Sequence, residues 1–532
     1  MSKLVDSPTL RHWLHDGAEI ALFDVREAGQ FGAAHLFYGI SLPYSRLELD
    51  ISRLAPRRTV RLVLCDDDQR IALRAAERLL ALGYTNVHVL AGGIRQWQEG
   101  GLPVFAGTNV PAKAFGELVQ QTCHTPAVDA PTLAAMLQRG DDVMVLDGRP
   151  LNEYRKLTIP GAVCCPNGEL GYRVHEIVRN PATTIVVSGD GRSGGIIGAQ
   201  TLINLGLPNP VMALENGIRG WYLAELEPEH GSSRRYPEQL SEAAKGAARK
   251  GSRQIAKDFG IREVDALTLS GWQAANQQSV FLCDVRTPAE FAADSLAGAQ
   301  SAPGGQLVQA TDQYVGVRHA RIVLFDNDGI RAPLVASWLQ QSGHQVWVLR
   351  GGLQCGLPLR KAGKVKALTT VLPLTSVDEL AAGLAERRLR VLDVRNSMAY
   401  RRAHIPDTVW GIRPHLPDLA AFADGCDVVL AGDDDGVVAL VAQEWRAGNP
   451  DAAAITLSQL IGGFDAWTAA QLPTASTPAL PADADCIDFL YFVHDRLDGD
   501  NDAARQYLQW EAGLPAQLDP QERAAFHLPP MA

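Results

Sequence analysis

The stretch that decides the fold is "LFDVREAGQFGAAHLFYGIS", residues 22–41. It starts as a short apolar run, ends that run with Asp-x-Arg, and has an aromatic residue five positions after the arginine. The same skeleton recurs as "VLDGRPLNEYRKLTIPGAV" (145–163), "LCDVRTPAEFAADSLAGAQ" (282–300) and "VLDVRNSMAYRRAHIPDTV" (391–409). Repeats spaced by more than 100 residues indicate whole domains rather than a solenoid of small units.

A second phrase follows each first phrase at a nearly constant distance. Between the aspartate of the first phrase and the first Gly or Asn of the second lie 67 to 69 positions. The copies are "LAGGIRQW" (90–97), "LENGIRGW" (214–221), "LRGGLQCG" (349–356) and "LIGGFDAW" (460–467). Between the two phrases, apolar runs such as "RLVLC" and "RIVLF" alternate with helical patterns such as "LRAAERLLALGY". This alternation predicts βα units and a parallel sheet with helices on both faces.

The chain of 532 residues has room for about four domains of ~100–150 residues. We therefore predict an α/β protein with four tandem domains, each a mainly parallel sheet with helices on both faces, and a short helical C-terminal tail. The tail contains one amphipathic stretch, residues 503–514, which we expect to dock on the body of the protein. The four domains, called units one to four, and the tail are expected at 1–106, 124–228, 259–360, 373–475 and 476–532.

Composition and charge narrow the possible partners. Hydrophobic residues make up 46% of the chain, charged residues 20%, and the formal net charge is -11. No basic stretch offsets that charge, which argues against nucleic acid or an anionic membrane as a partner. The N-terminus lacks the apolar core of a signal peptide, so we expect a cytoplasmic protein. The eight cysteines have no CxxC spacing, so we expect neither a metal site nor a cofactor, and the oligomeric state stays open.

These features together resemble the rhodanese superfamily. The features are the Asp-x-Arg phrase, the continuation seen in "AHIPD" (403–407), the strand-cysteine-loop-helix stretch and the Gly-Gly-x-x-x-Trp phrase. The order of the units also resembles proteobacterial proteins with four tandem rhodanese-like domains. The resemblance implies sulfurtransfer, in which a cysteine takes sulfane sulfur from a donor such as thiosulfate, holds it as a persulfide and passes it to cyanide or a thiol. A small sulfur-containing anion or thiol acceptor is then the expected partner, and a protein partner is a further one.

The loop of unit one, within "LVLCDDDQRIALRAA" (62–76), is where we expect the chemistry. Cys65 is the candidate nucleophile, because the Cys65 to Arg70 spacing of five matches the rhodanese pattern and is one residue too short for the related phosphatases. Backbone N–H groups at a helix N-terminus would stabilise its thiolate and an incoming anion. The expected substrate-binding loop residues are Asp66, Asp67, Asp68, Gln69 and Arg70.

A second alignment of the same loop leaves the role of Cys65 open. An ungapped match with "IVLFDNDGIRA" (322–332) places Cys65 opposite Phe325, as the last, buried residue of a strand. Electrostatics also weigh against the thiolate, because one carboxylate ~7 Å away costs about 2 kcal/mol at an effective dielectric constant of ~20. Helix dipoles return only about 0.3–1 kcal/mol.

The other three loops have lost the nucleophile. By counting back from the second phrase we expect Gly189 at the cysteine position of unit two, with Arg192 close by, although the resemblance implies that this unit commonly carries the cysteine. Unit three has Asp326 and Arg331 with the five-residue spacing, and unit four has Asp433 without an arginine.

We expect His35 and the Asp-x-Arg pairs to support the sheet edge beside the loops. These pairs are Asp24 with Arg26, Asp147 with Arg149, Asp284 with Arg286 and Asp393 with Arg395. The sequence therefore supports two hypotheses. The first is a sulfurtransferase that works through a Cys65 persulfide, and the second is a catalytically inactive four-domain binding or scaffold protein.

Overall fold

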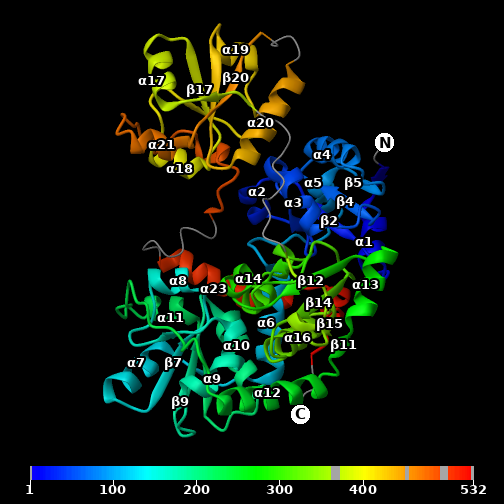
Figure 1. Ribbon diagram of the computed structural model, residues 1–532, viewed down its shortest axis with the longest axis vertical. Helices are drawn as coiled ribbons and strands as arrows, with labels where there is room; N and C mark the ends of the chain where they lie inside the picture. The colour runs from blue at the N-terminus through cyan, green and yellow to red at the C-terminus, as the bar shows by residue number, and fades with distance from the viewer. Residues whose placement is uncertain (1–2, 361–371, 450–453, 492–500, 529–532) are drawn as a thin grey trace.

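The structure is a computed structural model that describes residues 3–360, 372–449, 454–491 and 501–528 (Figure 1). Each unit contains one five-stranded sheet, and the strand orders are β1-β5-β4-β2-β3, β6-β10-β9-β7-β8, β11-β15-β14-β12-β13 and β16-β20-β19-β17-β18. All strand pairs within these sheets are parallel. The predicted fold class, four α/β units and a helical tail, is confirmed.

The strands are short, with four or five residues in the inner strands and two or three at the sheet edges. In unit one they are β1 (Lys3–Val5), β2 (Ala21–Asp24), β3 (Ile40–Ser41), β4 (Leu62–Cys65) and β5 (Val87–Leu90). In unit two they are β6 (Ala127–Val128), β7 (Val143–Asp147), β8 (Val163–Cys164), β9 (Thr184–Ser188) and β10 (Val211–Leu214). In unit three they are β11 (Arg262–Val264), β12 (Val280–Asp284), β13 (Gln300–Ser301), β14 (Arg321–Phe325) and β15 (Gln345–Leu349). In unit four they are β16 (Leu374–Thr375), β17 (Leu389–Asp393), β18 (Val409–Trp410), β19 (Asp427–Ala431) and β20 (Leu457–Leu460).

The helices connect these strands and cover both faces of each sheet. Unit one has α1 (Ser7–His15), α2 (Ala28–Ala33), α3 (Leu47–Leu54), α4 (Arg70–Ala81) and α5 (Gly93–Glu99), and α6 (Val110–Cys123) follows it. Unit two has α7 (Ala130–Arg139), α8 (Leu151–Lys156), α9 (Asn167–Ile177), α10 (Arg192–Asn204) and α11 (Gly217–Leu223), and α12 (Glu242–Asp258) follows it. Unit three has α13 (Ala266–Ala275), α14 (Pro288–Ala293), α15 (Gly304–Gln309) and α16 (Arg331–Gln341). Unit four has α17 (Val377–Ala385), α18 (Ser397–Arg402), α19 (Leu419–Ala423), α20 (Asp435–Gly448) and α21 (Gly463–Ala469), and the tail has α23 (Asn501–Gln517) and α24 (Pro520–Ala524).

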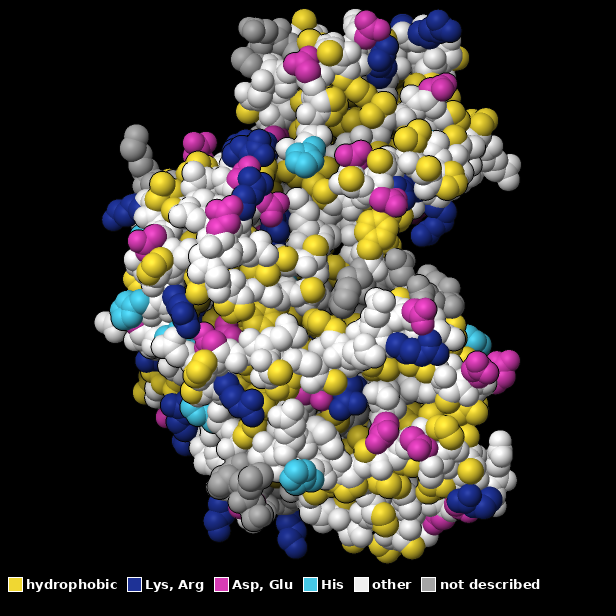
Figure 2. All heavy atoms as spheres, turned by 180° about the vertical axis from the view of Figure 1, so that it is seen from behind, with side chains coloured by type: hydrophobic (Ala, Val, Ile, Leu, Met, Phe, Trp, Pro, Cys, Tyr) yellow, Lys and Arg dark blue, Asp and Glu magenta, His cyan; other side chains and the backbone are white. Residues whose placement is uncertain are grey.

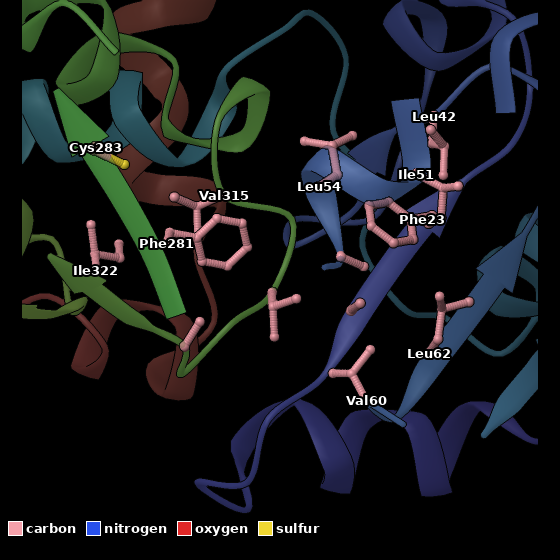
Figure 3. Close-up of a cluster of buried hydrophobic side chains, with 14 of the residues drawn as sticks. Phe23, Leu42, Ile51, Leu54, Val60, Leu62, Phe281, Cys283, Val315 and Ile322 are labelled. Atoms are coloured by element: carbon pink, nitrogen blue, oxygen red, sulfur yellow. The ribbon is translucent and has the colours of Figure 1, made fainter. Parts of the chain in front are cut away.

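Units one and three share one apolar core. On the unit one side it contains Phe23 of β2 and Ile51 and Leu54 of α3, and on the unit three side Phe281 of β12 and Ile322 of β14. Figure 3 shows these side chains facing one another between the two sheets. Continuous burial of this kind contributes about 25 cal/mol per Å² of apolar surface, which makes the two units one body.

Unit two joins this body through helices α9 and α10. Leu334 and Trp338 of α16 belong to the same apolar cluster as Leu170, Val174 and Leu202 of unit two. Helix α12, which the sequence places between the units, packs against both α9 and α16. Helix α23 of the tail packs along α6 and also contacts α10 and α11, so the tail docks on unit two, and Figure 1 shows it in red there.

Unit four stands at one end of the molecule in Figure 1 and contacts unit one through charged groups. Glu444 of α20 accepts hydrogen bonds from Arg74 and Arg78 of α4, each at 2.6 Å. Arg413 is fully buried and donates to both carboxylate oxygens of Glu48, at 2.5 and 2.7 Å. An interface made of ion pairs depends on pH more than an apolar core does.

Acid is expected to loosen this contact. Burial raises the pKa of Glu444, but Arg74, Arg413 and Arg78 outweigh it and lower the pKa to about 2. A depressed pKa means that the carboxylate stabilises the contact above the ordinary glutamate value of about 4.3, and that this stabilisation is lost as the pH falls towards 2. Small-angle X-ray scattering should show a larger radius of gyration for Glu444→Gln than for wild type at pH 7. The control is Glu386→Gln, because Glu386 forms an exposed ion pair with Arg388 in the same unit. Equal radii for the two variants would contradict the prediction.

The surface carries charges of both signs. Figure 2 shows Lys and Arg side chains intermingled with Asp and Glu over the face that it presents. Among the described residues, no helix combines the length and the apolar character needed to cross a membrane.

Candidate functional site

In every unit the Asp-x-Arg phrase forms a buried ion pair at the end of one central strand. Arg26 donates from Nε and Nη2 to the two carboxylate oxygens of Asp24, at 3.0 and 2.7 Å. The same guanidinium also donates to the carbonyl oxygen of Ala34, beyond α2. The arginine therefore ties the strand end to the chain that follows the next helix. The equivalent pairs are Arg149 with Asp147, Arg286 with Asp284 and Arg395 with Asp393.

His35 lies buried behind this ion pair. Its ring nitrogens are 2.9 Å from the carbonyl oxygen of Leu36 and 3.2 Å from that of Gly107, and the ring stacks on Phe31. Burial lowers the pKa of His35, which keeps the ring neutral at pH 7. A neutral, stacked histidine with both nitrogens beside carbonyl groups fits the supporting role expected from the sequence.

The register of each sheet fixes which residue opens each candidate loop. In each sheet, the aspartate of the Asp-x-Arg phrase pairs with the last residue of a neighbouring strand. That strand is β4, β9, β14 or β19 in units one to four. These strand ends are Cys65, Ser188, Phe325 and Ala431. The residue after each strand end is called the first loop residue below. The first loop residues are Asp66, Gly189, Asp326 and Gly432.

This register corrects two sequence predictions. Cys65 and Asp433 were expected at the nucleophile position, and each is one residue away from it, because Asp66 and Gly432 are the first loop residues. The prediction for unit two, Gly189, has the right register. The five-residue spacing to Arg70 selected Cys65, but Cys65 is the last residue of β4, so the loop starts one residue later.

Cys65 is buried in the core of unit one. Its side chain is 0% exposed and packs in the apolar cluster of Leu90 on β5 and Ile94 and Trp97 on α5. Helix α4, which follows the loop, covers the opposite face of the sheet. Burial raises the pKa of the Cys65 thiol well above its ordinary value, and the negative charge of Asp24 raises it further. The thiol is therefore neutral at pH 7 and shielded from dissolved anions.

Cys65 is expected to resist alkylation while the protein is folded. Iodoacetamide at about pH 8 should modify the partly exposed Cys123, Cys355 and Cys426 at least about tenfold faster than Cys65, because alkylation requires an accessible thiolate. Differential alkylation followed by mass spectrometry measures the four rates, and unfolding in guanidinium should make them similar. Labelling of Cys65 as fast as that of Cys123 in the folded protein would contradict this burial.

Asp66 occupies the position on which the N–H groups of loop one converge. Its carboxyl oxygens accept hydrogen bonds from the backbone of Gln69, of Ile71 at 2.7 Å and of Ala72 at 3.1 Å. Burial raises the pKa of Asp66, and these donors oppose the shift. Gln69 adopts a left-handed conformation, with φ of 70°, and its side chain accepts from Gly92 N–H. A loop side chain thus uses the N–H groups that a bound anion would need.

The charged residues of loop one do not gather around the thiol. Asp67 pairs with Arg26 at 2.7 Å, and Asp68 pairs with Arg70 at 2.8 Å. The Arg70 side chain is 84% exposed. The spacing between Cys65 and Arg70 therefore does not bring a guanidinium over a reactive sulfur.

Loop three is closed in the same way as loop one. Asp326 accepts hydrogen bonds from the N–H groups of Gly329, Ile330, Arg331 and Ala332, at 2.7 to 3.0 Å. The carboxylate is itself buried. It satisfies three of the donors that the N-terminus of α16 leaves free, and one further donor of the loop, Gly329 N–H.

Arg331 leaves loop three and connects two units. Its guanidinium is fully buried and donates from Nη1 to Glu169 of unit two at 2.9 Å and to Glu290 of unit three at 2.8 Å. Nη2 donates to Glu290 and to Asn327. The arginine that the sequence places at a substrate loop is therefore part of the contact between units two and three.

Loop four contains an internal acceptor one residue beyond the expected one. Asp433 is exposed, whereas Asp434 accepts from the N–H groups of Gly436 at 2.8 Å and Val437 at 3.3 Å. Gly432, the first loop residue, has no side chain to offer. The acceptor at the start of α20 is again a carboxylate of the loop.

Loop two receives its carboxylate from the tail. A Cβ added to Gly189 would lie 2.8 Å from the backbone nitrogen of Gly195, so the loop has closed over the space of the missing side chain. Glu511 of α23 accepts from the N–H of Arg192 and from the N–H and hydroxyl of Ser193. The sequence predicts that the tail docks, but nothing in it indicates that Glu511 reaches this loop.

Comparison with known proteins assigns this protein to a class. The family described as rhodanese-like domain matches residues 8–100, 129–224 and 269–355. The chain therefore belongs to the rhodanese superfamily of sulfurtransferases, and unit four, outside the matched ranges, repeats the same strand order.

Two relatives show how far the similarity extends. The crystal structure of a thiosulfate sulfurtransferase from Pseudomonas aeruginosa is 37% identical, with a TM-score of 0.91, and the match covers 100% of each chain. A sulfurtransferase from Allochromatium vinosum is 28% identical over 102 residues, 19% of this chain and 94% of that protein. The first similarity extends over all four units and the tail.

Proposed function

We propose that this chain is a non-catalytic rhodanese-like protein with a binding or scaffold role. All four loops lie within the described residues, and none of their first loop residues is a cysteine. The observation that carries the proposal is that the chain supplies a carboxyl group of its own to the N–H groups of every loop. These groups belong to Asp66, Glu511, Asp326 and Asp434 in units one to four.

The chemistry of sulfur transfer explains why this matters. A thiolate must attack the outer sulfur of thiosulfate, the S–S bond must break, and sulfite must leave with the bonding electron pair. The thiolate and the resulting persulfide both need the converging N–H groups for stabilisation. A carboxylate cannot hold a transferable sulfur atom, and where it accepts those N–H groups it also competes with any anionic donor.

The second candidate function is sulfur transfer through Cys65. It is favoured by the similarity to the Pseudomonas aeruginosa thiosulfate sulfurtransferase along the whole chain. In this alternative the cluster around Cys65 must open far enough for its sulfur to meet the donor.

A single experiment separates the two functions. The folded full-length protein is incubated with thiosulfate, and every cysteine peptide is examined by mass spectrometry for the addition of one sulfur atom. We expect no adduct on Cys65 and no cyanide-dependent thiocyanate above that of Cys65→Ser. A one-sulfur adduct on Cys65, together with thiocyanate formation that Cys65→Ser abolishes, would refute the non-catalytic proposal.

Cys123→Ser is the matched control, because that thiol is partly exposed and lies in α6, outside the four loops. Activity that survives Cys65→Ser but disappears in Cys123→Ser would also refute the proposal, and would assign the reaction to a different residue.

A further inference from the structure

Loop two differs from the other three loops in the origin of its carboxylate. Gly189, its first loop residue, has no side chain, and the carboxylate comes from Glu511, which lies 319 positions beyond Arg192 in the chain. In the other loops the acceptor belongs to the loop itself. Those acceptors are Asp66, Asp326 and Asp434. Loop two can therefore lose its carboxylate by movement of the tail, whereas the other loops cannot.

Glu511 binds at the N-terminus of α10 as a ligand would. Its Oε2 accepts from the N–H of Arg192 at 3.2 Å, and its Oε1 accepts from the N–H and the hydroxyl of Ser193 at 3.3 and 2.8 Å. The side chain is 1% exposed, and Nζ of Lys113 lies 3.9 Å from Oε1. Burial raises the pKa of Glu511, but Lys113 and the three donors outweigh it and lower the pKa. The group is an ionised carboxylate enclosed by the protein.

The charges around loop two favour a ligand with one negative charge. Arg192 is neutralised by Glu117, at 2.7 and 3.1 Å. The Lys113 side chain is largely buried, with 16% of it exposed. Its ammonium donates to the Tyr507 hydroxyl, lies 4.7 Å from the centroid of that ring, and has Glu511 as its paired carboxylate. Because a buried charge without a counter-charge is costly, removal of Glu511 leaves Lys113 in need of another anion.

Arg219 is a second buried cation beside loop two. Its guanidinium is fully buried, lies 4.4 Å above the ring of Tyr507 and donates from Nη2 to Asp190 of loop two. Its Nε and Nη1 have no hydrogen-bond partner within the described part of the chain. Buried donors of this kind require acceptors, and the oxygens of an anion are suitable ones.

We propose that loop two is a carboxylate-binding site, which Glu511 fills in this structure and which binds a small organic carboxylate when Glu511 is absent or displaced. The N–H groups of Arg192 and Ser193, the Ser193 hydroxyl and Lys113 hold the two oxygens. This inference rests on the proposed binding function and names its ligand class. The proposed function and this inference can fail separately, because a persulfide on Cys65 would not affect carboxylate binding at loop two.

The test uses acetate and the full-length variant Glu511→Ala. We expect the midpoint of thermal unfolding to fall by about 5 °C in this variant, because Lys113 loses its counter-charge. Sodium acetate at about 100 mM should restore about half of that loss in a saturable manner, relative to sodium chloride at the same ionic strength. Acetate should leave the wild-type midpoint unchanged, because Glu511 already fills the site.

Three controls make the outcome decisive. Gln509→Ala alters the exposed side of the same helix and should behave as wild type. Glu511→Gln keeps the site filled with a neutral side chain, so acetate should not stabilise it. Lys113→Met combined with Glu511→Ala should lose the acetate effect. Equal stabilisation of all variants by acetate, or stabilisation of Glu511→Ala by thiosulfate but not by acetate, would overturn the proposal.

If Glu511→Ala does not fold in chloride, refolding in acetate measures the same site. Recovery of folded protein in acetate but not in chloride would support the inference, and failure in both salts would count against it.

Discussion

Arg331→Ala is expected to lower the free energy of unfolding by about 3–5 kcal/mol, which is the usual loss when one partner of a buried ion pair is removed. Arg331 is fully buried and is bound to Glu169 of unit two and Glu290 of unit three. Without the guanidinium, both carboxylates remain close together with less compensation. Urea unfolding and amide hydrogen exchange of α9 and α16 measure the loss.

The pH dependence of this effect has a defined sign. Burial raises the pKa of Glu290, but Arg331 outweighs it and lowers the pKa to about 2. The carboxylate therefore stabilises the wild-type protein above the ordinary glutamate pKa of about 4.3, and this stabilisation is lost as the pH falls towards 2. The stability difference between wild type and Arg331→Ala should shrink over that range.

Arg350→Ala is the matched control for Arg331. Arg350 pairs with Glu263 on the surface of the same unit, and both side chains are more than half exposed. A surface pair of this kind contributes about 0–1 kcal/mol. Losses of equal size in the two variants would show that Arg331 does not hold units two and three together.

Asp326→Ala is expected to cost about 3–4 kcal/mol, because four N–H groups lose their common acceptor. Three of the four hydrogen bonds are buried, so water cannot easily replace the carboxylate. Faster hydrogen exchange in the first turn of α16, together with a lower urea midpoint, would report the loss. Asp326→Asn keeps one acceptor oxygen, so its stability should lie between those of wild type and Asp326→Ala.

Asp66→Ala and Asp433→Ala calibrate this prediction. Asp66 accepts from three N–H groups, so its loss should be smaller, about 2–3 kcal/mol. Asp433 is exposed, and its loss should stay within about 0.5 kcal/mol. A change of less than about 1 kcal/mol for Asp326→Ala would contradict the assignment of Asp326 as the acceptor for the start of α16.

Much of the fold could be predicted because its signals are local. The Asp-x-Arg phrase, the glycine phrase and the alternation of apolar runs with helical patterns each lie within a few residues. Such patterns specify parallel βα units without knowledge of distant contacts. They also place Gly189 and Asp326 at the cysteine positions of units two and three, and these residues directly follow β9 and β14.

The candidate site was harder to predict from the sequence than the fold, because a shift of one residue reverses the direction of a strand side chain. Cys65 and Asp66 are neighbours, yet Cys65 packs in the core beside α5 while Asp66 accepts from the start of α4. The match with "IVLFDNDGIRA" (322–332) gave the correct register, and the cysteine-to-arginine spacing gave the wrong one. Sequence spacing cannot distinguish these two alignments when loops of slightly different length are allowed.

The sequence by itself determined that this chain consists of four rhodanese-like units, and that three of the four loops lack a cysteine. Only the tertiary structure decided that the thiol of unit one is buried, that Arg331 joins two units, and that Glu511 closes loop two. The physical reason is that repeats and strands are specified by neighbouring residues, whereas burial, ion pairing and the filling of a loop depend on side chains that are brought together from distant parts of the chain.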